Sequence, residues 1–95
     1  KTAREKIASL LSIIARRDAI LSKSGGPRRV TFDLPLTREA MSDYLGLTLE
    51  TVSRQMSALR KDGIIELSGK REIIVPDLDA LLEEAADDSD GGMLS

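Results

Sequence analysis

The sequence predicts a small α+β domain that is mostly helical, on three observations. Two segments with helical spacing, 38–45 and 49–61, are separated by one short turn that contains a glycine. Two β-rich runs follow directly, joined by Ser-Gly-Lys-Arg, which is the pattern of a hairpin. With 95 residues, the chain is long enough for one compact core but not for two.

The first predicted helix runs to about Leu21. Thr2 and Glu5 have the spacing of a capping box, in which each side chain satisfies a backbone amide of the other residue. One apolar stripe with helical spacing follows: Ile7, Leu10, Leu11 and Ile14. Gly-Gly-Pro within 22–29 predicts a loop, and because the GxxxxGK[ST] spacing of a phosphate-binding loop is absent, we interpret it as a connector.

A short strand is predicted at 30–34, because VTFDL alternates apolar and polar residues and is closed by Pro35. Thr37 is the predicted N-cap of the second helix. Gly46 is the predicted left-handed residue that ends this helix. The apolar positions of the second helix are Met41, Tyr44 and Leu45.

The third helix follows its predicted N-cap, Thr48, and stops at Gly63. After the hairpin, Pro76-Asp77 opens a short C-terminal helix. This order of elements is that of a winged helix-turn-helix, with a short strand before it, a β-hairpin wing and a C-terminal helix. We expect the domain to span residues 1–86 and the acidic residues 87–95 to form a disordered tail.

The net charge of −2 is the sum of a basic part and an acidic part of the chain. Residues 77–95 hold seven of the 16 acidic residues and none of the 14 basic ones. Residues 1–76 therefore carry 14 basic and nine acidic residues, a net charge of +5. The low overall pI of about 5.1 comes from the acidic tail and does not argue against a nucleic-acid partner.

Composition also limits the chemistry. The chain has no Cys and no His, so the usual ligands of zinc, haem and thiol chemistry are missing, and we expect no metal and no cofactor in this domain. No run approaches the roughly 20 apolar residues that span a membrane, so we expect a soluble, cytoplasmic protein. Because the chain starts with Lys1 rather than Met, we expect it to be a piece of a longer protein.

The third helix has two faces. At about 100° per residue, its apolar stripe and its polar stripe are rotated by roughly 130° from each other. The apolar stripe, which anchors the helix to the domain, is Leu49, Val52, Met56 and Leu59. The polar stripe, which is free to point outward, is Glu50, Ser53, Arg54 and Ser57.

Two interpretations of the polar face compete. Glu50 and Arg54 can be an ordinary i, i+4 ion pair that contributes about 0.3–0.5 kcal/mol. Alternatively, they contact bases, because the first turns of the second helix of a helix-turn-helix enter the major groove. Arginine can bond O6 and N7 of guanine, a carboxylate can accept from the amino group of cytosine, and Ser53 permits close approach to a base. Residues predicted to contact the DNA backbone are Arg38, Thr48, Thr51, Ser57, Lys70 and Arg71.

At these residues the sequence resembles a known family. LPLTREAMSDYLGLTLETVSRQMSALRKDGII resembles the DNA-binding domain of the Crp/Fnr family of bacterial regulators, most closely its Fnr and FixK branches. The most specific part is E-x-x-S-R, matched by Glu50, Ser53 and Arg54. The resemblance implies that these three residues recognise a TTGAT half-site, two of which form a palindrome bound by a homodimer. The sequence departs from the pattern at Gln55, where an apolar residue is usual, and at Ser42, where Ala or Gly is usual.

The resemblance also implies parts that lie outside this chain. The family carries an N-terminal sensor domain and a long dimer helix, both missing here, and its regulators act on RNA polymerase. We therefore expect sequence-specific binding of double-stranded DNA by part of an oxygen- or redox-responsive regulator, with residues 49–60 as the recognition helix. The alternative is a winged-helix module for protein–protein interaction. No catalytic residue is predicted, because the acidic run 83–90 has neither a partner base nor a pocket.

Overall fold

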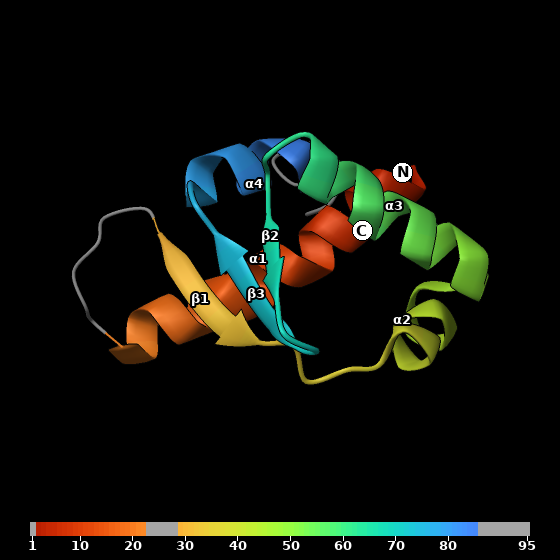
Figure 1. The fold of residues 1–95 in the computed structure, drawn as a ribbon, viewed down its shortest axis with the longest axis horizontal. Helices are drawn as coiled ribbons and strands as arrows, with labels where there is room; N and C mark the ends of the chain where they lie inside the picture. Colours follow the sequence, from red (N-terminus) through yellow and green to blue (C-terminus); the bar gives the residue numbers. More distant parts are fainter. Residues whose placement is uncertain (1, 23–28, 86–95) are drawn as a thin grey trace, which may run out of the picture.

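The computed structural model describes residues 2–22 and 29–85, and every predicted element is present in the predicted order. In Figure 1, α1 runs behind a small sheet, α4 covers one end of that sheet, and α2 and α3 lie together at its side. The elements are α1 (Ala3–Ser22), β1 (Val30–Asp33), α2 (Arg38–Leu45), α3 (Leu49–Lys61), β2 (Glu66–Ser68), β3 (Glu72–Val75) and α4 (Leu78–Ala85). This is a winged helix-turn-helix.

The three strands form one antiparallel sheet in the order β1-β3-β2, so β3 is central. Val30 pairs with Val75, and Ile73 pairs with Phe32 on one side and Leu67 on the other. The sequence predicted the strand and the hairpin separately but not their pairing. Because β1 pairs with the hairpin, the wing is held from both edges of β3.

The core lies between α1, the sheet and the helix-turn-helix. The apolar face of α1 is buried as predicted, since Ile7 and Leu11 are inaccessible to solvent. The capping box also forms: the amide of Thr2 donates to Oε1 of Glu5 at 2.9 Å, and the amide of Glu5 donates to Oγ1 of Thr2 at 3.1 Å. Other buried side chains come from β1, α2, α3, β3 and α4 and from Ile65, directly before β2: Phe32, Met41, Met56, Leu59, Ile65, Ile73, Val75 and Leu81.

The helix-turn-helix has the caps that the sequence predicts. Oγ1 of Thr37 accepts from the amide of Ala40 at 3.0 Å, and Oγ1 of Thr48 accepts from the amide of Thr51 at 3.1 Å. Gly46 has φ of 70°, the left-handed conformation in which a glycine avoids the steric cost of a Cβ. The turn between α2 and α3 is therefore set by local chemistry.

Two predictions about burial are wrong. Tyr44, assigned to the apolar face of α2, is 72% exposed. Leu49, assigned to the apolar stripe of α3, is 44% exposed, because the first residue of this helix extends past the core that buries Val52. The predicted loop in 22–29 lies almost entirely outside the described residues, since Ser22 ends α1 and 23–28 are not described. The predicted tail at 87–95 also lies outside them.

Candidate nucleic-acid interface

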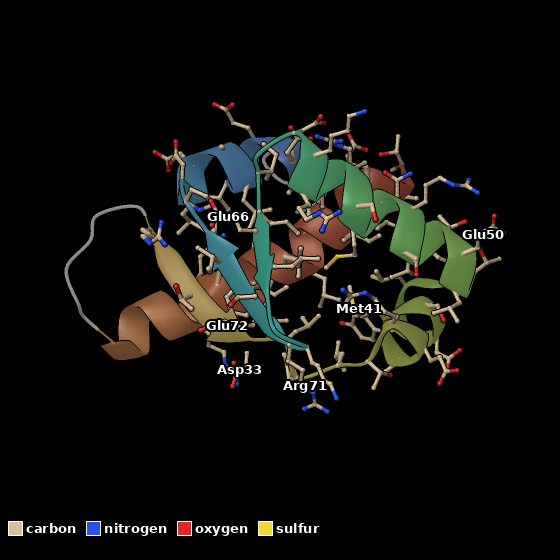
Figure 2. All side chains as sticks on the ribbon, in the orientation of Figure 1. Asp33, Met41, Glu50, Glu66, Arg71 and Glu72 are labelled. Carbon is tan, nitrogen blue, oxygen red and sulfur yellow. The ribbon has the colours of Figure 1, made fainter. Side chains whose placement is uncertain are left out.

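The predicted base-contacting residues all lie on the solvent side of α3. Val52, Met56 and Leu59 are buried against the domain. Glu50, Ser53, Arg54 and Ser57 are all exposed. Figure 2 shows Glu50 projecting outward from the end of α3 that follows the turn. The structure thus brings the four polar residues together on one free surface.

Glu50 and Arg54 form a direct ion pair. Nη2 of Arg54 donates to Oε2 of Glu50 at 2.7 Å, while the two side chains stay 64% and 79% exposed. Glu50 is also in the first turn of α3, where a carboxylate interacts favourably with the positive end of the helix dipole. The pair occupies one of the guanidinium nitrogens and one carboxylate oxygen, so each group keeps hydrogen-bonding capacity for a further partner.

The N-terminus of α3 presents donors to solvent. The hydroxyl of Thr48 donates to Oγ1 of Thr51 at 2.8 Å, and Oγ1 of Thr48 accepts from the Thr51 amide. This relay ends at the hydroxyl of Thr51, whose own proton can be donated outward. The first amides of the helix, at Leu49 and Glu50, also point out along the helix axis. The site has the donors that a phosphate needs.

A basic site lies between the wing, which is the β2–β3 hairpin, and α2. A hollow of about 340 Å³ is lined by both the start of α2 and the hairpin turn. Arg38 is the first residue of α2, and Lys70 and Arg71 lie in the turn between β2 and β3. Leu34, in the same lining, links the segment between β1 and α2 to the hairpin turn, because its amide donates to the carbonyl oxygen of Arg71 at 2.8 Å. Arg38 and the adjacent pair Lys70 and Arg71, which lie more than 30 positions apart in the sequence, therefore border one hollow.

Acidic side chains flank this basic site. Asp33 and Glu72 pair directly across β1 and β3, and Figure 2 shows both near Arg71 at the same end of the sheet. Like charges that face each other across two strands repel. Their position beside Arg71 offsets part of the positive charge at the wing.

Leu49 is a surface residue that helical spacing assigns to the core. It lies next to Glu50 and one turn before Ser53, and its exposure puts it at the edge of the polar face. A signal was present: Leu49 is the first residue of its helix, directly after the cap, where a side chain need not face the core.

The two departures from the family pattern are accommodated. Ser42 is buried, and its hydroxyl donates to the carbonyl oxygen of Glu39 at 2.7 Å, so its polar group is satisfied within α2. Gln55 is half-buried, which lets its amide remain in contact with water. Neither residue disturbs the caps on either side of the turn.

Over residues 2–22 and 29–85, none of the helices combines the length and apolarity needed to cross a bilayer. Within the same residues, no three acidic side chains are grouped so that they could hold a metal ion.

Comparisons with known proteins agree with this fold. A family model described as a Crp-like helix-turn-helix domain matches residues 5–84. The transcriptional activator protein FnrL of Cereibacter sphaeroides is 73% identical over 98% of this chain, and the nitrogen fixation regulation protein FixK of Azorhizobium caulinodans is 39% identical over 85%. The structure of FixK2 from Bradyrhizobium japonicum superposes on 90% of this chain with a TM-score of 0.71 and 38% identity.

The matched region is a part of each relative. The chain spans 38% of FnrL, 32% of FixK and 39% of the FixK2 chain. The family model covers residues 5–84, which is most of this chain, and the FixK2 structure shares its fold. The chain belongs to the Crp-like helix-turn-helix family.

Proposed function

We propose that this chain is the DNA-binding domain of a transcription regulator and that it places recognition helix 49–60 in the major groove of a TTGAT-type half-site. The observation that carries the proposal is the division of α3 into a buried apolar side and a free polar side that bears Glu50, Ser53 and Arg54. That side is exposed in the first turns of the helix, the part that enters the groove in a helix-turn-helix.

The Glu50–Arg54 pair serves base recognition rather than competing with it. Arg54 keeps four N–H donors beyond the one directed at Glu50, enough to bond both O6 and N7 of a guanine. Glu50 keeps one free oxygen, which accepts from the amino group of a cytosine. The bond between them limits the freedom of two long side chains before DNA arrives, and this lowers the entropic cost of the complex.

Two sites hold the DNA backbone. Thr48 and Thr51, with the first amides of α3, bind one phosphate at the helix N-terminus. Arg38, Lys70 and Arg71 bind the backbone from the hollow between α2 and the wing. Ser57 contacts the backbone one turn after Ser53. These contacts set the register of the helix, whereas Glu50, Ser53 and Arg54 select the sequence.

Leu49 adds an apolar contact to this set. Its exposed side chain lies at the edge of the base-contacting face, and the proposed half-site contains thymines. The 5-methyl group of thymine is the one apolar feature of the major-groove edge, and an aliphatic side chain is its natural partner.

The whole regulator extends beyond this chain. We infer a domain at 1–86 followed by a tail at 87–95, joined in the complete protein to an N-terminal sensor domain and a dimer helix. A homodimer then binds a palindrome, and it acts on RNA polymerase as a cytoplasmic, oxygen- or redox-responsive activator. The names of the relatives support the role in transcription regulation: FnrL is a transcriptional activator, and FixK is a nitrogen fixation regulation protein. We propose no cofactor for this domain.

The protein-interaction alternative has less support. Among the described residues, the large apolar side chains that are exposed are Ile13, Tyr44 and Leu49, and of these only Leu49 lies on α3. Because protein interfaces have an apolar centre, a helix that exposes one leucine beside four polar residues suits DNA better.

A gel-shift titration tests the proposal. Binding to a TTGAT…ATCAA duplex and to a scrambled duplex is measured at two salt concentrations. We expect tighter binding to the palindrome, and weaker binding to both duplexes at higher salt because phosphate contacts release counterions. Equal affinity for the two duplexes would contradict sequence recognition, and binding without salt dependence would contradict the backbone contacts.

A further inference from the structure

The first turn of α1 is tied to both the end of the recognition helix and α4. Nη1 of Arg4 lies 2.9 Å from Oδ2 of Asp62, and Nε of Arg4 donates to Oε1 of Glu84 at 2.7 Å. Two different nitrogens make the two bonds, so the guanidinium holds both carboxylates at once. Arg4 and Glu84 are largely shielded, whereas Asp62 is about half exposed.

Asp62 is an unusual residue for its position. It is the C-cap of α3, and its amide donates to the carbonyl oxygen of Ala58 at 3.0 Å. A carboxylate is disfavoured there, because the C-terminal end of a helix carries the negative end of the dipole. The positive charge of Arg4 offsets this unfavourable interaction, and the ion pair holds the Asp62 carboxylate in a defined position.

A neighbouring lysine makes a comparable contact with α2. Nζ of Lys6 donates to the carbonyl oxygen of Leu45, the last residue of α2, over a long 3.4 Å. The first turns of α1 therefore contact the C-terminal ends of both helices of the helix-turn-helix. Cations at helix C-termini are favourable. The last turn of α3 already carries Arg60 and Lys61, whereas the last turn of α2 has no basic residue of its own, so Lys6 of α1 supplies the cation there.

A small movement of Asp62, at one end of α3, displaces the base-contacting residues at the other end. Asp62 and Glu50 are 12 residues apart in one helix, or about 18 Å at 1.5 Å per residue. A tilt of about 5° at one end of a helix of that length moves the other end by about 1.5 Å. That displacement exceeds the tolerance of a bidentate hydrogen bond to a base.

We propose that Arg4 is a positioning residue for base recognition: by holding Asp62 against α1 and α4, it fixes the tilt of α3 and thereby the placement of Glu50 and Arg54. The inference rests on the proposed DNA-binding function. It assigns a role in specificity to a side chain outside the DNA-contacting face. Glu84 chiefly, together with Asp62, holds the pKa of Arg4 above its ordinary value.

Single substitutions at both ends of the contact test the proposal. The variants are Arg4→Gln, Asp62→Asn and their combination, with Glu83→Gln as the matched control, because Glu83 is exposed on α4 beside Glu84. The measured quantity is the ratio of the Kd for the scrambled duplex to that for the palindrome. Thermal melts by circular dichroism fix a temperature at which every variant is folded. Asp62→Asn alters an exposed group, so it supplies a folded variant even if Arg4→Gln melts early.

We expect Arg4→Gln and Asp62→Asn each to lower the Kd ratio by about three- to tenfold, and the double variant to lower it no further. Glu83→Gln leaves the ratio unchanged. A purely structural role would weaken binding to both duplexes alike and keep the ratio constant, which would overturn the proposal. If the unaltered chain itself failed to discriminate, the proposed function would fail as well, whereas discrimination retained by Arg4→Gln would overturn this inference alone.

Discussion

Nη2 of Arg54 donates to Oε2 of Glu50 at 2.7 Å across one turn of α3, and both side chains remain mostly exposed. An exposed pair of this kind contributes only about 0.3–0.5 kcal/mol to folding. Its value to the fold is therefore small, and neither residue is held in place by packing. The consequences of changing either residue should appear in DNA binding rather than in stability.

Arg54→Ala should weaken binding to the TTGAT palindrome by about 1–3 kcal/mol, because it removes a bidentate contact to guanine. Binding to a scrambled duplex should change much less. Lys70→Ala is the comparison, since Lys70 is also an exposed cation but lies at the wing. It should weaken binding to all sequences alike and reduce the salt slope by about 1. Fluorescence anisotropy with both duplexes over a salt series measures both effects.

Identical behaviour of these two variants would contradict the division between base contacts and backbone contacts. A chemical denaturation curve of each variant serves as the control, because both side chains are exposed and neither change should alter stability by more than about 0.5 kcal/mol.

Glu50→Gln should have the opposite effect on non-specific binding. Removing a carboxylate from a surface near phosphates should tighten binding to the scrambled duplex, while loss of the cytosine contact weakens binding to the palindrome. Both changes should therefore lower the ratio of the Kd for the scrambled duplex to the Kd for the palindrome. The matched control is Glu39→Gln, because Glu39 is an exposed acid in the first turn of α2. A Glu50→Gln variant that kept the full ratio would leave Glu50 with only its helix-dipole and ion-pair roles.

Local chemistry accounts for what the sequence could predict. The caps at Thr37 and Thr48 and the glycine turn at Gly46 each depend on residues within one helical turn, and all form as expected. The polar face of α3 follows from helical periodicity, which is also local. The start and end of α2 and α3 could therefore be placed from the sequence alone.

Long-range contacts account for what could not be predicted. The pairing of β1 with β3 joins segments about 40 residues apart, and no turn between them fixes it. The contact between Arg4 and Glu84 spans 80 residues, and nothing in the sequence around either residue marks it as a partner of the other. Likewise, the exposure of Tyr44 and Leu49 depends on where the core ends, which helical spacing does not encode.

The unequal burial of α2 can be tested on two residues in adjacent turns. Met41 is fully buried and Tyr44 is mostly exposed, although helical spacing places both on the apolar side of α2. Met41→Ala should lower the free energy of unfolding by about 2–5 kcal/mol, because it leaves a cavity in the core. Tyr44→Ala should lower it by no more than about 0.5 kcal/mol. Urea denaturation followed by circular dichroism gives both values, and a large loss for Tyr44→Ala would mean that this ring is packed.

The turn of the helix-turn-helix should be sensitive at Gly46 and tolerant at Ser42. Gly46→Ala forces a Cβ into the left-handed conformation and should cost about 1–2 kcal/mol of stability, although the added atom meets no neighbour. Ser42→Ala removes a hydroxyl that is bonded only within its own helix and should change stability by no more than about 0.5 kcal/mol. Urea denaturation measures both. A large loss for Ser42→Ala would show that the hydroxyl is required at the contact between α2 and α3.

Leu49 offers the sharpest test of which way α3 faces the DNA. If its exposed side chain contacts a thymine methyl group, replacing that thymine by deoxyuridine should cost the unaltered chain about 0.8 kcal/mol, the value of one buried methyl-sized group. The same replacement should cost Leu49→Ala almost nothing, because the methyl group has already lost its partner. This cycle isolates one contact and leaves every hydrogen-bonding group of the base in place. Lys70→Ala is the control and should show the full cost of deoxyuridine. An equal cost in all three proteins, at each thymine of the half-site, would mean that Leu49 faces away from the bases.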